Sequence, residues 1–333
     1  MANIKDVAKL AGVSISTVSR VVNNSAGVAK EKSDAVLRAM SDLNYQPNTF
    51  AKALVSNKSD AIGVVVGNLS EPFFGQMMHG IENVAHQYNK QLVVSAGHQN
   101  AALEREAIQS LINRRCDALI VHSKALTDYQ LMELLENQPA SVLINRQIPD
   151  IKDHCVYLDS RKMGRIVSDY LLTHGHTDIA TIMSSEAISD SSDRQQGYQD
   201  ALAAHGVIPN PKLNRSCPTT LSEAYNTTLE LLDSGTPFSA IFVFSGIMSV
   251  GVMKALRERR VQVPGDISVI AVGDGTLAHY LNPVLTIGHY PIFDMATTAA
   301  ELAMHLCDPK LPRPEQLTFS PNVMSGETVS KRR

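Results

Sequence analysis

The chain has 333 residues, 44% of them hydrophobic and 19% charged, with a formal net charge of −3 at pH 7, which fits a globular protein of two or three domains. No apolar run approaches the roughly 18–20 residues that span a bilayer, and the charged N-terminus lacks the apolar core of a signal peptide. The four cysteines are widely scattered without a CxxC pair. We therefore expect a cytoplasmic protein with free thiols and no membrane partner.

The first expected helix begins after Asn3, whose side chain can cap the helix N-terminus, and Asp6 suits the positive end of the helix dipole. Apolar residues recur at helical spacing and form one buried face: Ile4, Val7, Ala8 and Ala11. Gly12 then ends the helix, because a left-handed backbone costs glycine little. These features predict a short helix followed by a tight turn.

A second helix is expected directly after this turn, with Ser14 as its N-cap. Its apolar side consists of Val18, Val21 and Val22, and its opposite face carries Ile15, Ser16, Thr17, Arg20 and Asn23. Short residues let the backbone approach base edges, and longer ones reach bases or phosphates. The pattern therefore fits a helix-turn-helix in the DNA major groove. An ordinary two-helix hairpin within a core is the alternative.

The N-terminal segment is basic although the chain as a whole is acidic. Residues 1–60 contain eight Lys or Arg and five Asp or Glu, a net charge of about +3. Because the whole chain carries −3, the remainder carries about −6. A basic segment attached to an acidic remainder is typical of a nucleic-acid-binding module on a separate domain, which favours the DNA-binding interpretation.

A third helix is expected over Glu31–Leu43. Its inward-facing residues would be Val36, Ala39, Met40 and Leu43. Tyr45-Gln46-Pro47-Asn48 breaks this helix, and a short second helical run follows over residues 48–54. That run is too short to be stable alone, so we expect it to fold only when it packs on something else.

After residue 60, short apolar runs alternate with helical patterns. Ala61–Val66 is a continuous apolar run, as expected of a strand buried on both faces. Further strands are expected at residues 92–94, 118–121, 141–144, 179–183, 240–244 and 267–272. Helices are expected at residues 77–88, 103–114, 129–136, 161–173, 193–205, 222–232 and 248–257. This alternation predicts an α/β fold with parallel sheets in two similar lobes.

Ligands of open α/β sheets bind outside the carboxyl ends of the strands. We therefore expect a cleft between the two lobes. The loops that line it should follow Val66, Val121, Ile144, Met183, Phe244 and Val272.

Several motifs give the chain a specific resemblance. Besides the helix-turn-helix and its tail, they are the Pro72-Phe73-Phe74-Gly75 turn, Asn145-Arg146, and the stretches 193–198, 263–268 and 283–286. Residues 2 to about 325 thereby resemble the lactose/galactose repressor family of bacterial transcription regulators, and within it the galactose-type members.

The resemblance implies a domain organisation. A helix-turn-helix domain (1–46) would be followed by a hinge helix and linker (47–59). A two-lobed, periplasmic-binding-protein-like domain (60–333) would then bind an effector and form a dimer. The chain would cross between the lobes near residues 159, 289 and 320. Lobe 1 would hold residues 60–159 and 290–320, and lobe 2 residues 160–289 and 321–333.

The resemblance also implies which residues contact DNA: Asn3, Ser14, Ile15, Ser16, Thr17, Ser19, Arg20, Asn23, Tyr45, Asn48, Lys52 and Leu54. In the family the hinge helix forms only on operator DNA, and Leu54 matches the leucine that wedges into the minor groove. The alternative is a plain linker leucine that covers the next domain. Ile15 and Ser16 depart from the small apolar pair of the galactose-type members, so we expect a variant operator.

Seven residues match effector-contacting positions: Phe73, Phe74, Arg146, Asp190, Arg194, Ser245 and Asp274. Aromatic rings stack on sugars, and a guanidinium suits a pair of neighbouring hydroxyls. The alternatives are that the two phenylalanines belong to the lobe core and that Arg194 is a solvated residue paired with Asp190 or Asp193.

Two acids of the family pattern are missing from the cleft. Ser245-Gly246 stands where the family usually has Asn-Asp or a similar pair, and Gly273-Asp274 where it has two successive acids. A lost carboxylate leaves a sugar hydroxyl unpaired, at a cost of roughly 1–3 kcal/mol each. Three hypotheses follow: the protein binds a different small ligand, binds D-galactose weakly, or represses without any inducer.

We expect a homodimeric repressor of galactose or related sugar genes that acts on near-palindromic operator DNA, with D-galactose as a possible effector. No cofactor or metal is expected, because the eleven histidines show no metal-ligand spacing. The absence of GxGxxG, Walker, HExxH and GxSxG motifs argues against an enzyme. The alternatives are a periplasmic sugar receptor, an enzyme on the same scaffold, and an architectural DNA binder without an effector.

Overall fold

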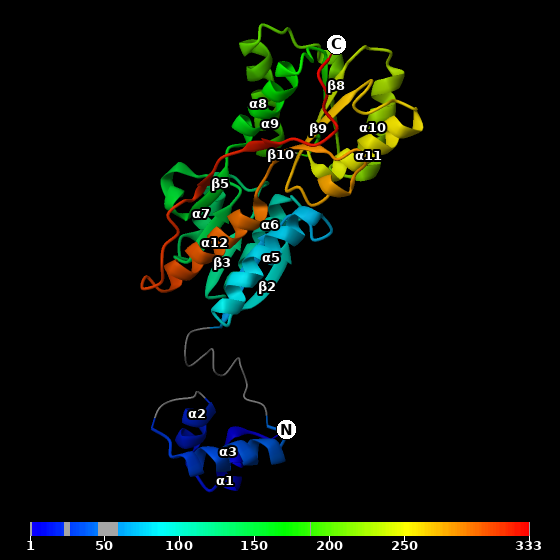
Figure 1. Ribbon diagram of the computed structural model, residues 1–333. Coiled ribbons are helices and arrows are strands. Elements are labelled where there is room, and N and C mark those ends of the chain that lie inside the picture. The colour runs from blue at the N-terminus through cyan, green and yellow to red at the C-terminus, as the bar shows by residue number, and fades with distance from the viewer. Residues whose placement is uncertain (1, 23–26, 46–58, 187, 333) are drawn as a thin grey trace. The chain divides into compact units, whose positions relative to one another are not determined.

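The computed structural model describes residues 2–22, 27–45, 59–186 and 188–332 (Figure 1). Its contacts divide the chain into two compact units, Met1–Ser59 and Asp60–Arg333. We call them the head and the body, and each is described by itself.

The head contains three helices, α1 (Ile4–Leu10), α2 (Ile15–Val22) and α3 (Lys30–Asp42). The Asn3 side chain accepts hydrogen bonds from the backbone of α1, and the Asp6 carboxylate accepts one from the Asn3 backbone. Gly12 has a φ of +64°, which fits the expected helix end. The buried core joins all three helices through Val7, Ala8, Val18, Val21, Val36 and Ala39. The three predicted helices are therefore confirmed, with α3 shifted by one residue.

The first sheet of the body has six parallel strands in the order β11–β5–β4–β3–β1–β2. Their bounds are β1 (Ala61–Val66), β2 (Gln91–Ala96), β3 (Ala118–Val121), β4 (Ser141–Ile144), β5 (Cys155–Leu158) and β11 (Thr318–Phe319). Every residue of β1, β3 and β4 is buried, which explains their unbroken apolar sequences.

The second sheet repeats this topology in the order β12–β10–β9–β8–β6–β7. Its strands are β6 (Ile179–Ser184), β7 (Asn214–Cys217), β8 (Ala240–Val243), β9 (Ser268–Gly273), β10 (Thr286–His289) and β12 (Asn322–Met324). Only β12 runs antiparallel to its neighbour among these described strands. The body thus consists of two α/β lobes built on the same strand order.

Helices cover the two sheets separately (Figure 1). The first lobe has α5 (Pro72–Gln87), α6 (Ala101–Asn113), α7 (Asp128–Leu135) and α12 (Ile292–Cys307). The second has α8 (Ser160–Thr173), α9 (Ser189–Ala204), α10 (Leu221–Asp233) and α11 (Gly246–Glu258). Short 3₁₀ turns lie at Pro149–His154, Pro211–Leu213 and Ala278–Tyr280. Although α12 is far from α5 in the sequence, the two helices pack side by side.

The chain passes between the lobes at three places, namely from β5 to α8, from β10 to α12 and from β11 to β12. Three connecting segments therefore join two otherwise separate lobes. Such connections permit the lobes to move relative to each other as rigid bodies.

Two helix starts differ from the sequence predictions, and both differences shape the cleft. Pro72–Gly75 is the first turn of α5, whose helix was expected only from Met77, because Pro72 takes the favourable first helical position. Helix α9 begins at Ser189, four residues before the expected start. Asp190 and Arg194 consequently lie one turn apart on the same helix.

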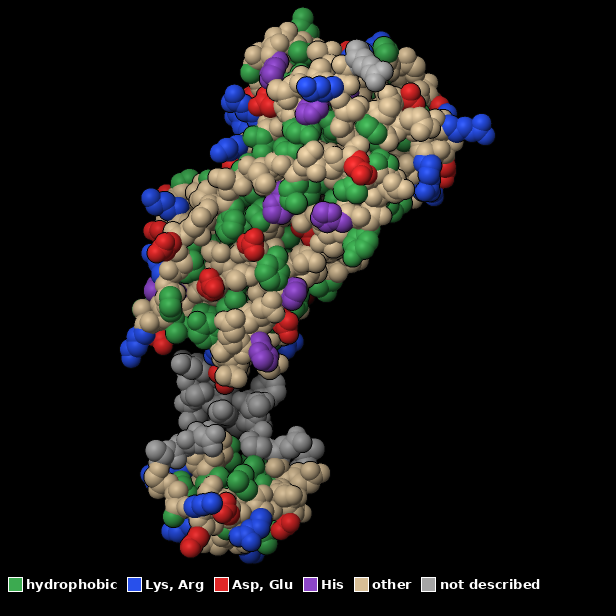
Figure 2. Space-filling model, viewed as in Figure 1, with side chains coloured by type: hydrophobic (Ala, Val, Ile, Leu, Met, Phe, Trp, Pro, Cys, Tyr) green, Lys and Arg blue, Asp and Glu red, His purple; other side chains and the backbone are tan. Residues whose placement is uncertain are grey.

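Acidic and basic side chains are interspersed over the visible face of the body (Figure 2). Cys116, Cys155 and Cys217 are buried free thiols, and Cys307 is exposed. Within the described ranges, no helix combines the length and apolar character that crossing a membrane requires.

Candidate functional site

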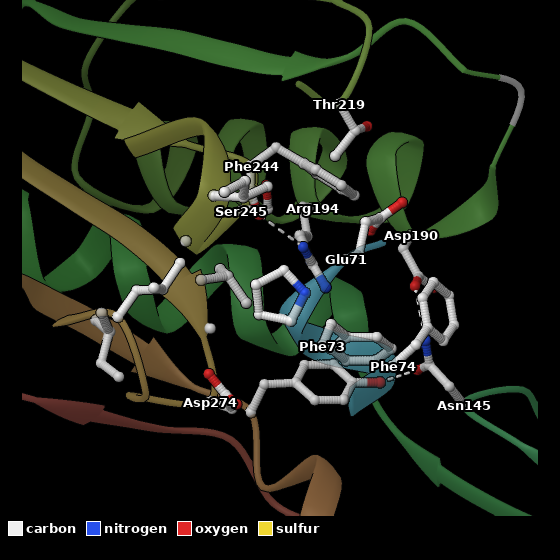
Figure 3. Close-up of a pocket in the computed structure, with 18 of the residues that line it drawn as sticks. Glu71, Phe73, Phe74, Asn145, Asp190, Arg194, Thr219, Phe244, Ser245 and Asp274 are labelled. Carbon is white, nitrogen blue, oxygen red and sulfur yellow. Dashed lines mark hydrogen bonds between the residues drawn. The ribbon is translucent and has the colours of Figure 1, made fainter. Parts of the chain in front are cut away.

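A cavity of about 930 Å³, including its opening to solvent, lies between the two lobes (Figure 3). Six predicted loops line it, those that follow β1, β3, β4, β6, β8 and β9. Their lining residues include Phe73, Lys124, Asn145, Asp190, Ser245 and Asp274. The expectation that ligands meet the carboxyl ends of the strands is therefore confirmed for the position of the cavity.

Aromatic rings form one wall of the cavity. Phe73 contacts the Phe74 ring edge-to-face at 5.2 Å between centroids and the Tyr290 ring at 5.6 Å. Phe74 is only 2% exposed and belongs to the hydrophobic core, whereas Phe73 is half-buried. The core alternative thus describes Phe74 better, and Phe73 with Tyr290 provides the surface on which a sugar ring could lie.

An ion pair connects the two lobes across the cavity. The Lys124 ammonium of the first lobe lies 2.8 Å from the Asp190 carboxylate of the second. The Asn145 side-chain amide donates to the other Asp190 oxygen at 2.9 Å, and the Tyr290 hydroxyl donates to the Asn145 side-chain carbonyl. Lys124 also donates to the backbone carbonyl of Asn145. Asp190 is therefore held by two groups of the opposite lobe.

The charges in this network are set by burial and by each other. Burial opposes ionisation of Asp190, but the Lys124 and Arg194 cations outweigh it and lower the pKa of its carboxyl to about 2. Burial lowers the pKa of the Lys124 ammonium, and Asp190 opposes that shift. Burial and Lys124 lower the pKa of His122 to about 3, so this histidine is neutral at pH 7. Lys124 and Asp190 consequently form a charged pair whose side chains are largely buried.

Arg194 lies in the cavity and is only 5% exposed, which contradicts its alternative interpretation as a solvated side chain. Its guanidinium carbon lies 4.5 Å from the Phe244 ring centroid and 5.8 Å from that of Tyr290. One terminal nitrogen donates to the Phe244 carbonyl at 2.8 Å, while Nε has no hydrogen-bond partner among the described atoms. Stacking between two rings fixes the planar group, and its remaining donors are available to a ligand.

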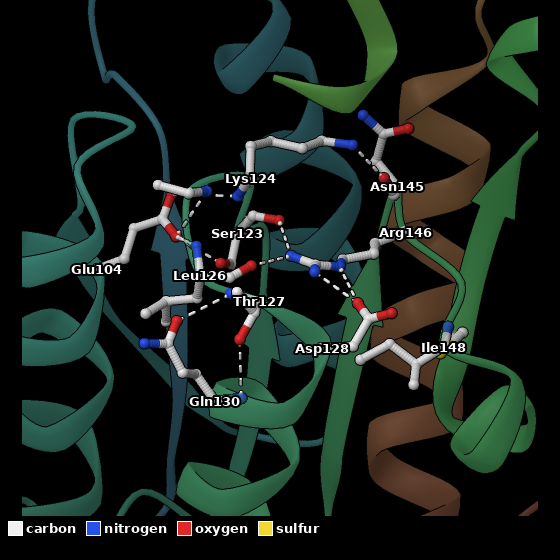
Figure 4. A network of polar contacts seen from close by, with 12 residues as sticks. Glu104, Ser123, Lys124, Leu126, Thr127, Asp128, Gln130, Asn145, Arg146 and Ile148 are labelled. Carbon is white, nitrogen blue, oxygen red and sulfur yellow. Dashed lines mark hydrogen bonds and ion pairs between the residues drawn. The ribbon is translucent and has the colours of Figure 1, made fainter. Parts of the chain in front are cut away.

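Arg146 does not line the cavity, contrary to the sequence prediction (Figure 4). Its guanidinium turns away from the cavity to the Asp128 carboxylate at 3.0 Å and to the Leu126 carbonyl at 2.7 Å. The buried Glu104 carboxylate accepts backbone hydrogen bonds from the same loop, including that of Lys124 at 3.1 Å. Both side chains hold the loop in place, because its backbone groups have no regular sheet or helix partners. Arg146 therefore positions Lys124 indirectly.

Ser245 and Asp274 both line the cavity, as predicted. The buried Ser245 hydroxyl has no hydrogen-bond partner among the described atoms. Both Asp274 oxygens are engaged by Thr276, through its backbone N–H at 3.1 Å and its hydroxyl at 2.8 Å. A ligand would share Asp274 with this turn, since each carboxylate oxygen can accept more than one hydrogen bond.

Glu71, the residue directly before α5, is a cavity carboxyl group whose pKa is strongly raised. Burial, and secondarily the Glu186 carboxylate, raises the pKa of Glu71 to about 7. Glu186 comes from the second lobe and accepts hydrogen bonds from Thr219 and Ser184. At Glu71, the folded chain therefore holds up to one proton more than the unfolded chain between pH 4.5 and pH 7.

This difference predicts that stability falls as pH rises from about 4.5 through 7, because the raised pKa favours the folded state only where Glu71 is protonated. The Glu71→Gln variant should lose that dependence and exceed the native chain in stability at pH 8 by on the order of 1 to 2 kcal/mol, allowing for solvent screening. Urea unfolding between pH 4.5 and pH 8 measures it. Glu82→Gln, at an exposed position of α5, is the control and should retain the native pH profile.

The predicted DNA-reading residues gather around the N-terminus of α2 in the head. Ser14 accepts a hydrogen bond from the backbone of Thr17 at 3.2 Å, which confirms it as an N-cap. Ser16 and Arg20 are exposed, and Ile15 is 45% exposed despite its apolar side chain. Asn3 is exposed as well, whereas Thr17 and Ser19 are partly buried. An exposed isoleucine beside small hydroxyl residues is suited to a thymine methyl group in the major groove.

Four predicted DNA contacts lie outside the described residues: Asn23, Asn48, Lys52 and Leu54. Tyr45 is described and packs partly buried against the head core. The predicted hinge segment 47–59 likewise falls almost wholly outside the described residues.

Sequence reasoning missed several cavity residues, among them Glu71, Lys124, Asn145 and Tyr290. The first three of these are the most informative. The rule that loops after parallel strands line the cleft covers the first three, since each follows a predicted strand. Choosing them among their neighbours required the cross-lobe pairing with Asp190, which no sequence pattern displays. Among the described residues, no group of three or more His, Cys, Asp or Glu side chains could hold a metal ion.

Comparisons with known proteins give a consistent result. Residues 3–48 match the family described as "Bacterial regulatory proteins, lacI family", and residues 168–329 match the "Periplasmic binding protein-like domain". The chain is 42% identical to the transcriptional regulator GalR of Escherichia coli K12 over 331 residues, which cover 99% of this chain and 96% of that protein. It is 38% identical to GalS of Salmonella typhimurium, covering 100% of this chain and 98% of GalS.

A solved structure, the lac repressor dimer bound to operator and an anti-inducer, has the same fold. Its TM-score is 0.86 at 24% sequence identity, and the similarity covers 99% of both chains.

Proposed function

The chain belongs to the lacI family of bacterial regulatory proteins, and we propose from this membership that it acts as a homodimeric repressor of sugar uptake or metabolism genes. Each head would read one half-site of a near-palindromic operator, since operator symmetry mirrors dimer symmetry. D-galactose or a related sugar would be the effector. The protein would work in the cytoplasm without enzymatic activity.

One observation supports this proposal most: a single chain combines an exposed, polar helix start in α2 with a cavity that both lobes line. The cavity has an aromatic wall, a stacked guanidinium and several hydrogen-bonding groups, a combination suited to a sugar. A ligand that contacts both lobes would change their relative position. We propose that residues 47–59 form a hinge helix on DNA, with Leu54 wedged into the minor groove, and transmit this change.

A second candidate, a DNA-binding regulator that needs no effector, is favoured by a specific contact. The pair between Lys124 and Asp190 already connects the lobes in the chain alone, at 2.8 Å. Such a contact could keep the body in one arrangement without any sugar. The two candidates differ in whether a sugar changes operator affinity.

The head makes a direct prediction for DNA binding. Arg20→Ala should lower operator affinity about tenfold and reduce the slope of log affinity against log salt by about one, because one phosphate or base contact is lost. Fluorescence anisotropy on a labelled galactose-type operator, at several salt concentrations, measures both effects.

Arg257→Ala is the matched control, since Arg257 is an exposed arginine of the body. It should leave operator affinity and salt slope unchanged. A scrambled duplex of the same length should bind the native chain at least a hundredfold more weakly than the operator. Equal binding to both duplexes would refute sequence-specific recognition.

A further inference from the structure

The cavity contains a buried cation, Arg194, that acts electrostatically on Asp190 but makes no direct ion pair within the described ranges. Lys124 is paired with Asp190, but Arg194 forms no ion pair with any residue of the described ranges. Its guanidinium is 5% exposed, and Nε has no hydrogen-bond partner among the described atoms. A buried charge is costly unless it is paired. An anionic ligand group that pairs with the Arg194 guanidinium would therefore bind favourably.

The first turn of α11 lies at the same end of the cavity. Arg194 donates to the carbonyl of Phe244, and α11 begins two residues later, at Gly246. The N-cap residue Ser245 makes no side-chain capping hydrogen bond, and its buried hydroxyl is unpaired among the described atoms. Helix α11 has 13 residues, and the backbone N–H groups of its first turn lack the side-chain acceptor that usually caps a helix. The helix dipole adds positive potential beside Arg194.

Positions 246 and 273, at this end of the cavity, carry no carboxylate, although there is room for one. A Cβ built at Gly246 would meet no atom nearer than the Val272 carbonyl oxygen, at 4.0 Å. A Cβ at Gly273 would lie 3.7 Å from the nearest atoms, those of Gly246, which is an ordinary contact. Packing therefore does not require glycine at either position. The two glycines leave a space that positive groups border.

The acids of the cavity lie elsewhere or have partners. Asp190 is neutralised by Lys124 at 2.8 Å, and Asp274 accepts two hydrogen bonds from Thr276. Glu71 directly precedes α5, which belongs to the first lobe, whereas Arg194 and Ser245 belong to the second. Figure 3 shows Ser245 and Arg194 close together, Glu71 between Arg194 and Asp190, and Asp274 on the opposite side of the cavity. The charge distribution is thus asymmetric within a single site.

We propose that the effector is an anionic sugar, whose carboxylate or phosphate lies at the first turn of α11 against Ser245 and the Arg194 guanidinium. The sugar ring would lie on Phe73 and Tyr290. This inference rests on the proposed function and specifies the chemical class of its effector.

Titration calorimetry on the full-length chain with matched sugars tests the proposal. D-galacturonate and D-galactose differ only in a carboxylate against a hydroxymethyl group, as do D-glucuronate and D-glucose. At least one acid should bind on the order of 10- to 100-fold more tightly than its neutral counterpart, as expected for a charge-assisted hydrogen bond. The 6-phosphates of galactose and glucose distinguish a phosphate from a carboxylate as the preferred anion.

The variants Gly246→Asp and Gly246→Asn separate charge from shape. Both side chains fill the same space, but only the aspartate adds a negative charge, so affinity for the anionic sugar should be at least tenfold lower in Gly246→Asp than in Gly246→Asn. Gly273→Asp is a second charge variant should Gly246→Asp fail to fold. Thermal unfolding of each variant checks that the body remains intact.

Three outcomes would overturn the inference: a neutral sugar that binds as tightly as its acid, no binding by any anionic sugar of the set, or equal losses in Gly246→Asp and Gly246→Asn. Operator binding is measured separately on the same preparation. Loss of the anion preference with intact operator specificity would refute the effector class alone, whereas absent operator specificity would refute the proposed function.

Discussion

Replacing Asp190 by asparagine is expected to lower the free energy of unfolding of the body by about 3–5 kcal/mol, since it leaves a buried ammonium without its counter-ion. The Lys124 side chain is 4% exposed and the Asp190 side chain 12%, so water cannot replace the lost carboxylate. The same change should weaken ligand binding, because Asp190 contacts both Lys124 and Asn145 of the opposite lobe.

The pH dependence of this effect follows from the lowered pKa of Asp190, about 2 against the ordinary 3.8. A carboxyl with a depressed folded-state pKa contributes its stability fully above the unfolded value and loses it as pH falls through the folded value. The native chain and Asp190→Asn should therefore differ most at neutral pH and converge between about pH 4 and pH 2.

Urea unfolding of the full-length chain, followed by the transition of the body, measures the effect. Asp233→Asn is the matched control, because it breaks the exposed pair between Asp233 and Arg259, with side chains 56% and 44% exposed. That control should lose far less stability than Asp190→Asn, because water screens an exposed ion pair. Equal losses in the two variants would show that the pair across the cavity has no special energetic role.

The contact between α8 and α9 gives the second large prediction. A Cβ on Gly164 would lie 2.2 Å from the carbonyl oxygen of Arg194, and a Cβ on Gly197 would lie 2.0 Å from that of Arg161. The two helices therefore approach backbone to backbone, and Gly164→Ala must push α9 away. We expect a loss of about 3 kcal/mol or more in stability. Ligand affinity should fall at least tenfold as well, since α9 carries Asp190 and Arg194.

Gly75→Ala is the matched control for this prediction. Gly75 also lies within a helix, α5, but a Cβ there would meet no atom within 4 Å. Because alanine has the higher helix propensity, this variant should gain about 0.5–1 kcal/mol. The two substitutions are measured by thermal unfolding and by sugar titration. A Gly164→Ala variant as stable as the native chain would contradict the close helix packing.

Much of the fold could be predicted because local patterns specify it. The helix-turn-helix follows from Asn3, Gly12 and Ser14, and the parallel sheets follow from unbroken apolar runs such as Ala61–Val66. Other elements lacked such signals. β7 is a polar edge strand, Asn214–Cys217, and α12 is the most apolar of the described helices, so its pattern is harder to assign to one element type.

The candidate site was predictable in position more than in detail. Strand order places the loops, so Ser245 and Asp274 could be assigned to the cavity from the sequence. The orientation of Arg146 could not be assigned, since its partner Asp128 lies at the start of another element, α7. The pairing of Lys124 with Asp190 joins residues 66 positions apart and depends on how the two lobes meet.

The central claim is that occupancy of the cavity controls operator binding. The most direct measurement is fluorescence anisotropy of a labelled galactose-type operator and a scrambled duplex, each with and without D-galactose and D-galacturonate. The account predicts specific operator binding whose affinity one of these sugars changes at least fivefold, with sugar affinity changing by the same factor when operator is present. Equal binding to the two duplexes, or operator affinity that neither sugar changes, would contradict it.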